Sequence, residues 1–210
     1  QLGAVHGDIA GWAVASTYGN VPDEYMATQE GVGIVDRSHL GRILARGSDT
    51  LDLLNRLSTN LVDPLAVGKG ESTVITTGKG RILDWITMLH HSDDVLLVTS
   101  PERRETVSEW IDAYTFEENT TLEDVTATTV MLSFIGPKSE TVLDTLLGTS
   151  TAPLSRLDSM TIDLHGHEVI VARTNPGGQS GFDVIAPVEA AGGLWTAGLE
   201  LGASPVGQDA

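Results

Sequence analysis

Apolar residues recur along most of this chain with the spacings expected of alternating strands and helices. Residues 41–47 predict a short strand, and Ser48 or Asp49 then caps a helix. One face of that helix carries Leu51, Leu54 and Leu57. Strand-like runs follow at 72–77, 81–90 and 94–99, separated by glycine-containing or polar turns. This order predicts a strand, a helix and an antiparallel meander.

The strongest helix signal comes next, after Ser100 and Pro101, which together favour a helix start. Four apolar side chains then fall at i, i+3, i+4 and i+7, namely Val107, Trp110, Ile111 and Tyr114. A strand-like run at 121–125 closes this half of the chain. By contrast, residues 1–30 predict irregular structure apart from a short helix near 23–31.

A similar order of elements begins again at residue 129. The predicted strands are 129–135, 160–164, 168–173 and 182–185. One helix follows Gly136 and Pro137, and a weaker one follows Pro187. The repeat lies in the pattern and not in residue identity. It predicts an α+β fold of two related modules with antiparallel sheets and flanking helices.

Composition narrows the classes of partner. Twelve basic against twenty-nine acidic residues give a formal net charge of -17, which disfavours nucleic acid and anionic membranes as partners. No apolar run is long enough to predict a membrane span. The absence of cysteine excludes disulfides and thiolate chemistry within these residues and fits a cytoplasmic location.

Three segments have residue types that packing alone does not explain. Residues 35–42 form either a polar turn, in which Asp36 and Ser38 bond nearby backbone, or a loop lining a polar pocket. Composition alone favours the turn. Residues 175–184 form either a plain hairpin loop or a glycine-rich ligand loop that enters a strand.

The third segment, residues 78–85, places Asp84 in an otherwise apolar strand. A carboxylate in such a strand is paired, exposed or functional, and Arg81 is the nearest candidate partner. Lys79 and Arg81 are also suited to an anionic ligand. Neither glycine-lysine pair forms a phosphate-binding P-loop, because Asp63 and Thr73 stand where that motif requires glycine.

The histidines do not predict a metal site. His90 and His91 point to opposite faces of a strand, whereas His165 and His167 flank a probable turn without a nearby cluster of carboxylates.

In this order, the segments resemble the glycine cleavage T-protein (aminomethyltransferase) superfamily, which includes folate-binding YgfZ-type proteins linked to iron-sulphur cluster maintenance. Residues 33–39 resemble the family's glycine, Phe/Val, Asp, x, Ser, His motif. Further segments resemble its later motifs, at 80–84, 135–137, 178–183 and 205–207.

The resemblance implies a set of folate-binding residues. Asp84 takes the place of the first acid of the family's Asp-Asp pair, a folate contact and the candidate catalytic carboxylate, while Trp85 replaces the second acid. Asp183 takes the place of the glutamate that grips the pterin, where a carboxylate can accept two parallel hydrogen bonds. His39 and Phe182 lie in the matching motifs and are expected in the same site.

The folate's anionic tail requires local positive charge on so acidic a chain. The four candidate cations are Arg37, Arg42, Lys79 and Arg81.

The resemblance also implies a discontinuous first domain, residues 1–46 with 127–210, and an inserted second domain, residues 47–126. The family's C-terminal β-barrel and the YgfZ cysteine signature would lie beyond residue 210.

Three functions follow as alternatives. The lysine-glycine-arginine turn at 79–81 favours a tetrahydrofolate-binding, YgfZ-like protein that acts on iron-sulphur proteins. The second alternative is an aminomethyltransferase that moves a one-carbon unit from an aminomethyl-lipoyl carrier protein to tetrahydrofolate. The third is a non-catalytic interaction module. Trp85, and Gln179 in place of another acid, are departures from the aminomethyltransferase pattern.

Overall fold

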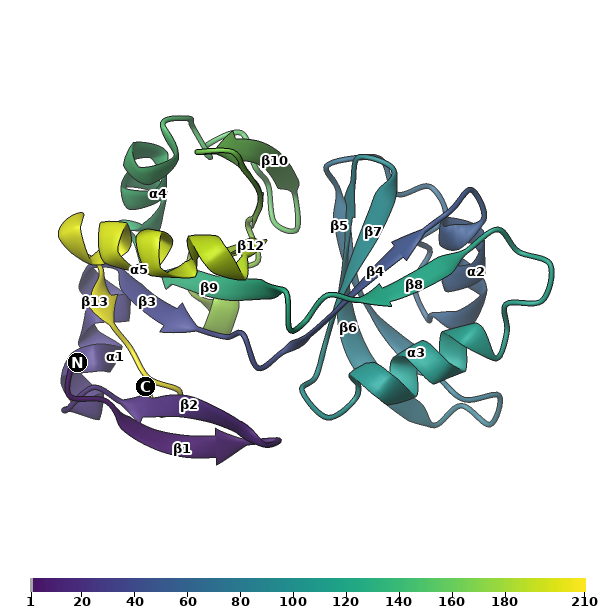
Figure 1. Ribbon diagram of the computed structural model, residues 1–210, viewed down its shortest axis with the longest axis horizontal. Helices are drawn as coiled ribbons and strands as arrows, with labels where there is room; N and C mark the ends of the chain where they lie inside the picture. The colour runs from purple at the N-terminus through teal and green to yellow at the C-terminus, as the bar shows by residue number, and fades with distance from the viewer. Residues whose placement is uncertain (1) are drawn as a thin grey trace. The chain divides into compact units, whose positions relative to one another are not determined.

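The computed structural model describes residues 2–210 and divides into two compact units (Figure 1). The first unit comprises the chain up to His39, Thr128–Arg156 and Met160–Ala210. The second comprises Leu40–Ala127 together with Leu157–Ser159.

The second unit is a five-stranded antiparallel sheet with two helices on one face (Figure 1). Its elements are β4 (Gly41–Arg46), α2 (Thr50–Leu57), β5 (Gly70–Thr76), β6 (Ile82–His91), β7 (Asp94–Thr99), α3 (Arg104–Asp112) and β8 (Thr121–Asp124). The strand order is β5-β6-β7-β4-β8. Leu53 and Leu54 of α2 and Val107 and Ile111 of α3 pack on the sheet and are fully buried. Of the predicted apolar stripes, Leu54, Val107 and Ile111 are in the core, Leu51, Leu57 and Trp110 pack partly buried against it, and Tyr114 lies beyond α3 and is exposed.

The first unit contains a six-stranded sheet of order β10-β11-β12-β9-β3-β13. Its strands are β3 (Gly33–Asp36), β9 (Thr129–Ile135), β10 (Ser159–Leu164), β11 (His167–Ala172), β12 (Gly181–Pro187) and β13 (Ser204–Pro205). Its helices are α1 (Val21–Glu30), α4 (Ser139–Leu147), α5 (Ala191–Glu200) and two short 3-10 turns, η1 (Pro176–Gly178) and η2 (Val188–Ala190). A separate hairpin joins β1 (Val5–Ile9) to β2 (Trp12–Thr17).

The two sheets share the spatial order of five strands, β5-β6-β7-β4-β8 in one and β10-β11-β12-β9-β3 in the other. The last strand of this order differs in its place along the chain, because β8 follows the second helix of its unit whereas β3 precedes β9. In each unit a strand, a helix, three strands and a second helix follow one another along the chain. The predicted α+β fold of two related modules with antiparallel sheets is confirmed, with one parallel pair, β13 with β3.

Three local predictions are wrong. The stretch predicted as irregular contains the β1–β2 hairpin. Val35 and Asp36, predicted to lie in a polar turn or loop, form the end of strand β3 (Gly33–Asp36), between β9 and β13. Helix α3 begins at Arg104 and not near Ser100, since both the amide and the hydroxyl of Ser100 bond to Asp84. These bonds anchor Ser100, and residues 101–103 form a turn before α3 begins.

The boundary between the units also differs from the expected division after residue 46. The chain passes from one unit to the other between His39 and Leu40. Strand β4 belongs to the second unit because it pairs with β7 on one side and β8 on the other.

Glu24 on α1 ties together distant parts of the first unit. Its buried carboxylate accepts hydrogen bonds from the hydroxyl of Thr17 and from the amides of Tyr18 and Gly207. Burial alone would raise the pKa of Glu24, but these hydrogen bonds outweigh it and lower that pKa below its ordinary value. The ionised carboxylate therefore joins the end of β2, the first turn of α1 and the C-terminal segment.

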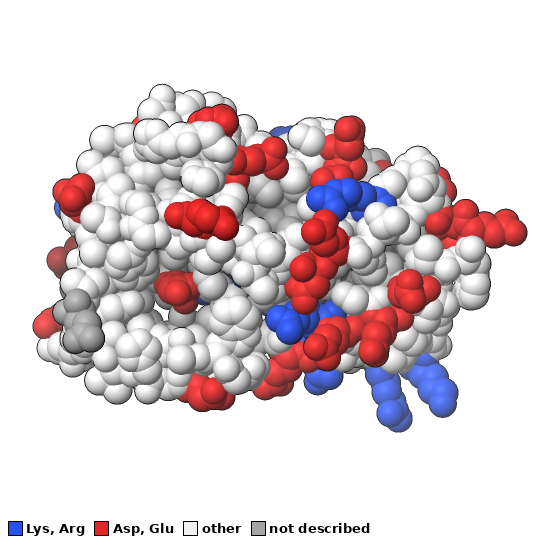
Figure 2. All heavy atoms as spheres, viewed as in Figure 1, with Lys and Arg blue, Asp and Glu red and all other residues white. Residues whose placement is uncertain are grey.

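Acidic side chains outnumber basic ones on the face shown in Figure 2, in keeping with the net charge. Among residues 2–210, no helix has the length and apolar character needed to cross a membrane.

Arg42, expected to face an anionic ligand, is instead fully buried within the second unit. Its Nη1 donates to the carbonyl of Leu40 at 2.6 Å, and its Nη2 donates to that of Thr126 at 2.7 Å. Leu40 and Thr126 lie where the chain enters and leaves this unit. The guanidinium satisfies a buried carbonyl and a half-buried one and clamps the ends of this segment together.

We expect Arg42→Met to lower the free energy of unfolding by roughly 2 to 6 kcal/mol, because two carbonyls each lose a donor worth about 1 to 3 kcal/mol. Urea denaturation measures the loss. The matched control is Arg46→Met on the same strand, where half-exposed ion pairs with Asp94 and Glu123 predict a change within about 1 kcal/mol. Equal losses in the two variants would contradict the clamp.

Candidate functional site

Asp84 is a buried carboxylate on the helix-covered face of its sheet, with 5% of its surface exposed. It pairs with Ile75 and alternates with Ile86, and both neighbours belong to the core. Its Oδ1 accepts hydrogen bonds from the Trp85 amide at 2.9 Å and the Ser100 hydroxyl at 2.7 Å. Its Oδ2 accepts one from the Ser100 amide at 2.9 Å. Thus Ser100, and not Arg81, holds this carboxylate.

A β-bulge beside Asp84 exposes two apolar side chains. Thr76 pairs with Ile82 and Ile75 pairs with Asp84, so Leu83 is the extra residue of β6. Ile82 and Trp85 therefore both lie on the face opposite Asp84, and they are 70% and 67% exposed. The tryptophan that replaces the family's second acid does not share the environment of the first acid.

Asp183 lies on the face of its sheet opposite the core and is 3% exposed. Its Oδ1 accepts a short hydrogen bond from the hydroxyl of Ser133, the residue directly across on β9. Its Oδ2 accepts one from the hydroxyl of Thr174 at 2.6 Å. Arg37 adds an ion pair, with Nη1 3.5 Å from Oδ1. Three elements of the first unit therefore meet at this carboxylate.

Residues 36–38 form the polar turn that composition favours, and Arg37 projects from it. The Ser38 amide donates to Asp36 Oδ1 at 2.9 Å, which is the local turn favoured by composition. The Ser38 hydroxyl accepts a hydrogen bond from the Met131 amide at 3.0 Å, which fixes the turn on β9. This anchoring leaves Arg37 pointing at Asp183, while His39 is buried at 7% exposure.

Phe182 is not placed as expected for a ligand contact. Strand alternation turns its ring away from Asp183 and into the core of the first unit, where it is fully buried. The Arg173 guanidinium lies 4.6 Å from the ring centroid and covers it on one side. A phenyl ring so enclosed has no surface to offer a folate.

Lys79 and Arg81 lie in the exposed turn between β5 and β6. Gly80 has a φ of 70°, and its amide donates to the Thr77 carbonyl at 2.8 Å, which closes the turn. Neither cation forms an ion pair with any residue in the described range 2–210. Both remain available to an anion.

The two carboxylates have similar remaining capacity for hydrogen bonds. A carboxylate offers about four acceptor positions. In each of Asp84 and Asp183, Oδ1 has two partners and Oδ2 has one. Each can accept one further bond at Oδ2. Asp183 can hold two parallel N–H donors once the long contact with Arg37 gives way.

The comparisons with known proteins identify the family. A family model described as the GCVT N-terminal domain matches residues 1–210. The chain belongs to this family. It is 30% identical to the aminomethyltransferase of Thermotoga neapolitana over 100% of the chain and 58% of that protein. It is 31% identical to that of Geobacillus thermodenitrificans over 99% of the chain and 58% of that protein.

Solved structures have the same fold. The glycine cleavage system aminomethyltransferase T from Bartonella henselae matches with a TM-score of 0.89 at 21% identity, over 99% of the chain and 57% of that protein. A chain of the heterotetrameric sarcosine oxidase from Corynebacterium sp. U-96, in complex with pyrrole 2-carboxylate, matches with a TM-score of 0.62 at 17% identity. That match covers 89% of this chain and 94% of the other. The GCVT-family chain spans little more than half of the aminomethyltransferases it matches.

The sequence did not single out the hydroxyl groups of Ser100, Ser133 and Thr174. Ser133 is separated from Asp183 by fifty positions, so only the strand pairing brings the two together. Ser133 could have been recognised as a candidate site residue in the way Asp84 was, because it is a polar residue in an otherwise apolar strand.

We expect Ser133→Ala to destabilise the protein by roughly 1.5 to 3 kcal/mol, the range for a hydrogen bond to a charged group. A double-mutant cycle with Asp183→Ala, followed by urea denaturation, measures the coupling. The control is Ser72→Ala, which removes a neutral hydroxyl contact with Thr87 at 3.1 Å and should cost less. Additive losses in the Ser133 and Asp183 variants would argue against the interaction.

Proposed function

We propose that this chain is the reduced-folate-binding part of an aminomethyltransferase of the T-protein type, in which Asp84 and Asp183 contact tetrahydrofolate. The observation that carries the proposal is the match of the family model over residues 1–210. The names of the relatives favour this alternative over the YgfZ-like one. The two buried carboxylates supply acceptors for a ligand rich in N–H donors.

Asp183 grips the pterin in this proposal. The Ser133 hydroxyl donates to one of its oxygens and the Thr174 hydroxyl to the other. The carboxylate then accepts the N–H donors of the ring in place of the Arg37 guanidinium. Because aspartate is one methylene shorter than glutamate, the ring must approach β12 more closely than it would approach a glutamate.

Asp84 orients the folate and assists proton movement at the reacting nitrogen. Three donors from Trp85 and Ser100 hold the carboxylate in one orientation, which favours a fixed geometry at the reacting atom. The bound folate would accept the one-carbon unit, and a lipoyl carrier protein would deliver it with release of ammonia. Lys79 and Arg81 attract the anionic tail.

A second candidate function is YgfZ-like folate binding in support of iron-sulphur proteins. The lysine-glycine-arginine turn and the exposed Trp85 in place of the second acid favour it. Release of ammonia from an aminomethyl-loaded lipoyl carrier protein separates the two functions, since the second requires folate binding without that release.

Calorimetric titration of tetrahydrofolate into the folded chain tests the binding residues. We expect saturable binding that is lost or strongly weakened in Asp84→Asn and Asp183→Asn, because each loses an anionic acceptor. The Lys79→Gln, Arg81→Gln double variant should bind more weakly, with a smaller dependence of affinity on salt.

The control is Asp93→Asn in the exposed turn between β6 and β7, which removes the same charge and should bind as the parent does. Circular dichroism confirms that each variant is folded. Unchanged affinity in both folded carboxylate variants would exclude these residues as folate contacts.

A further inference from the structure

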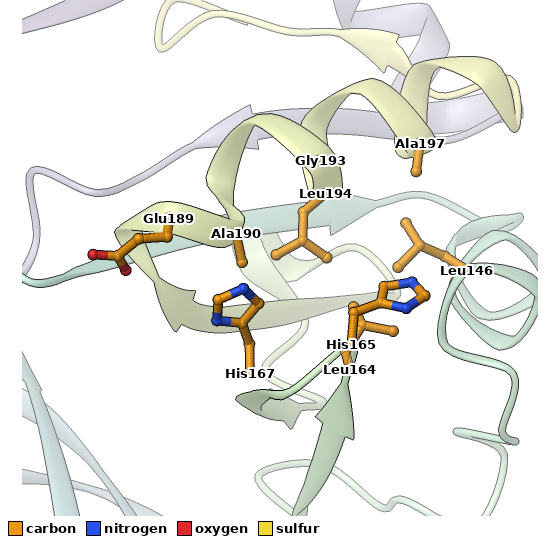
Figure 3. Close-up of a pocket in the computed structure, with 9 residues that line it drawn as sticks. All are labelled: Leu146, Leu164, His165, His167, Glu189, Ala190, Gly193, Leu194 and Ala197. Atoms are coloured by element: carbon orange, nitrogen blue, oxygen red, sulfur yellow. The ribbon is translucent and has the colours of Figure 1, made fainter.

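A pocket whose lining includes neither Asp84 nor Asp183 lies within the first unit. It is a cavity of about 300 Å³ bounded by the end of α4, the turn between β10 and β11, and the segment η2–α5 (Figure 3). This volume is at the lower end of the range for small-molecule sites. The cavity therefore suits a ligand of a single ring.

The walls of this cavity are mainly apolar. The apolar lining side chains are Leu146, Leu164, Ala190, Leu194 and Ala197. They come from helices and a strand end that belong to the core of the unit, so the walls are held in place by packing. An apolar ring that enters this space exchanges part of its contact with water for contact with these side chains.

Gly193 keeps the cavity open. Glycine is among the poorest helix formers, yet Gly192 and Gly193 both lie in the first turn of α5. Neither has a positive φ, and a Cβ at either would meet no atom within 4 Å. Neither backbone conformation nor close packing therefore requires glycine here. Only Gly193 lines the cavity, where a side chain would fill the space.

Two imidazoles supply the polar groups of the site. Figure 3 shows His167 directed toward Ala190, and His165 beside Leu146. Within residues 2–210, neither ring is hydrogen-bonded to another protein group. A neutral imidazole offers one donor and one acceptor. His165 is exposed and His167 is half-buried, so a ligand's hydroxyl or ring nitrogen would take the place of water on either ring.

The charges at the rim select against ions. No lysine or arginine lines the cavity, and the one carboxylate there, Glu189, points away from it (Figure 3). The chain as a whole carries a net charge of -17, which further disfavours an anion. Among residues 2–210, no group of three histidines or carboxylates has an arrangement suited to a metal ion.

We propose that this cavity binds a small, uncharged aromatic molecule whose hydroxyl or ring nitrogen hydrogen-bonds to His165 or His167. The proposal does not depend on folate binding, because it involves different residues and a different class of ligand. Phenol is a suitable first probe, and benzoate is its anionic counterpart of similar size.

Titration of phenol into the 210-residue chain, followed by NMR, provides the test. We expect saturable shifts confined to the rings of His165 and His167 and the methyl groups of Leu146, Leu164 and Leu194. Benzoate should bind more weakly. Tighter binding of benzoate, or phenol shifts spread over the protein without saturation, would overturn the proposal.

Gly193→Leu should abolish the saturable shifts, because the new side chain occupies the cavity. Gly192→Leu is the matched control: it makes the same change one position earlier in α5, outside the lining, and should bind phenol as the parent does. Equal binding by both folded variants would contradict the proposal. If Gly193→Leu does not fold, the phenol titration of the parent chain still tests the proposal, because saturable shifts outside the cavity residues would contradict it.

Discussion

The buried guanidinium of Arg42 is the interaction on which the second unit depends. Its bonds to the carbonyls of Leu40 and Thr126 hold together the two ends of the segment Leu40–Ala127, and the Val125 amide donates to the Arg42 carbonyl. Strand β4 then pairs with β7 up to Gly41 and Thr99, one residue before Ser100. Ser100 in turn fixes Asp84. The position of the candidate catalytic carboxylate therefore depends on this clamp through a continuous set of contacts.

Both candidate carboxylates are held by hydroxyl groups. Ser100 bonds to Asp84, while Ser133 and Thr174 bond to Asp183. Hydroxyl donors fix the orientation of a carboxylate and leave it with free acceptor positions. Only Asp183 also contacts a cation, Arg37, at a distance long enough to yield to a ligand. This arrangement is suited to binding N–H donors.

The order of strands and helices could be predicted because each module repeats the same sequence of apolar periods. The β1–β2 hairpin could not, since its strands are largely exposed and lack regular alternation. The different roles of Arg37 and Arg42 could not be predicted from the sequence either. Arg37 and Arg42 lie five positions apart in one polar segment, yet one faces a carboxylate and the other is buried against backbone carbonyls. Phe182 was predictable in retrospect, because neighbours on a strand point to opposite faces.

The central claim is that Asp183 grips the pterin of a reduced folate. A crystal structure of the chain with 5-formyltetrahydrofolate tests it most directly, because the ligand's ring and the carboxylate can be seen together. The account predicts density for the pterin with its N–H donors within hydrogen-bond distance of Asp183, and Arg37 moved away from Oδ1. A pterin bound elsewhere, with the Arg37–Asp183 ion pair intact, would contradict it.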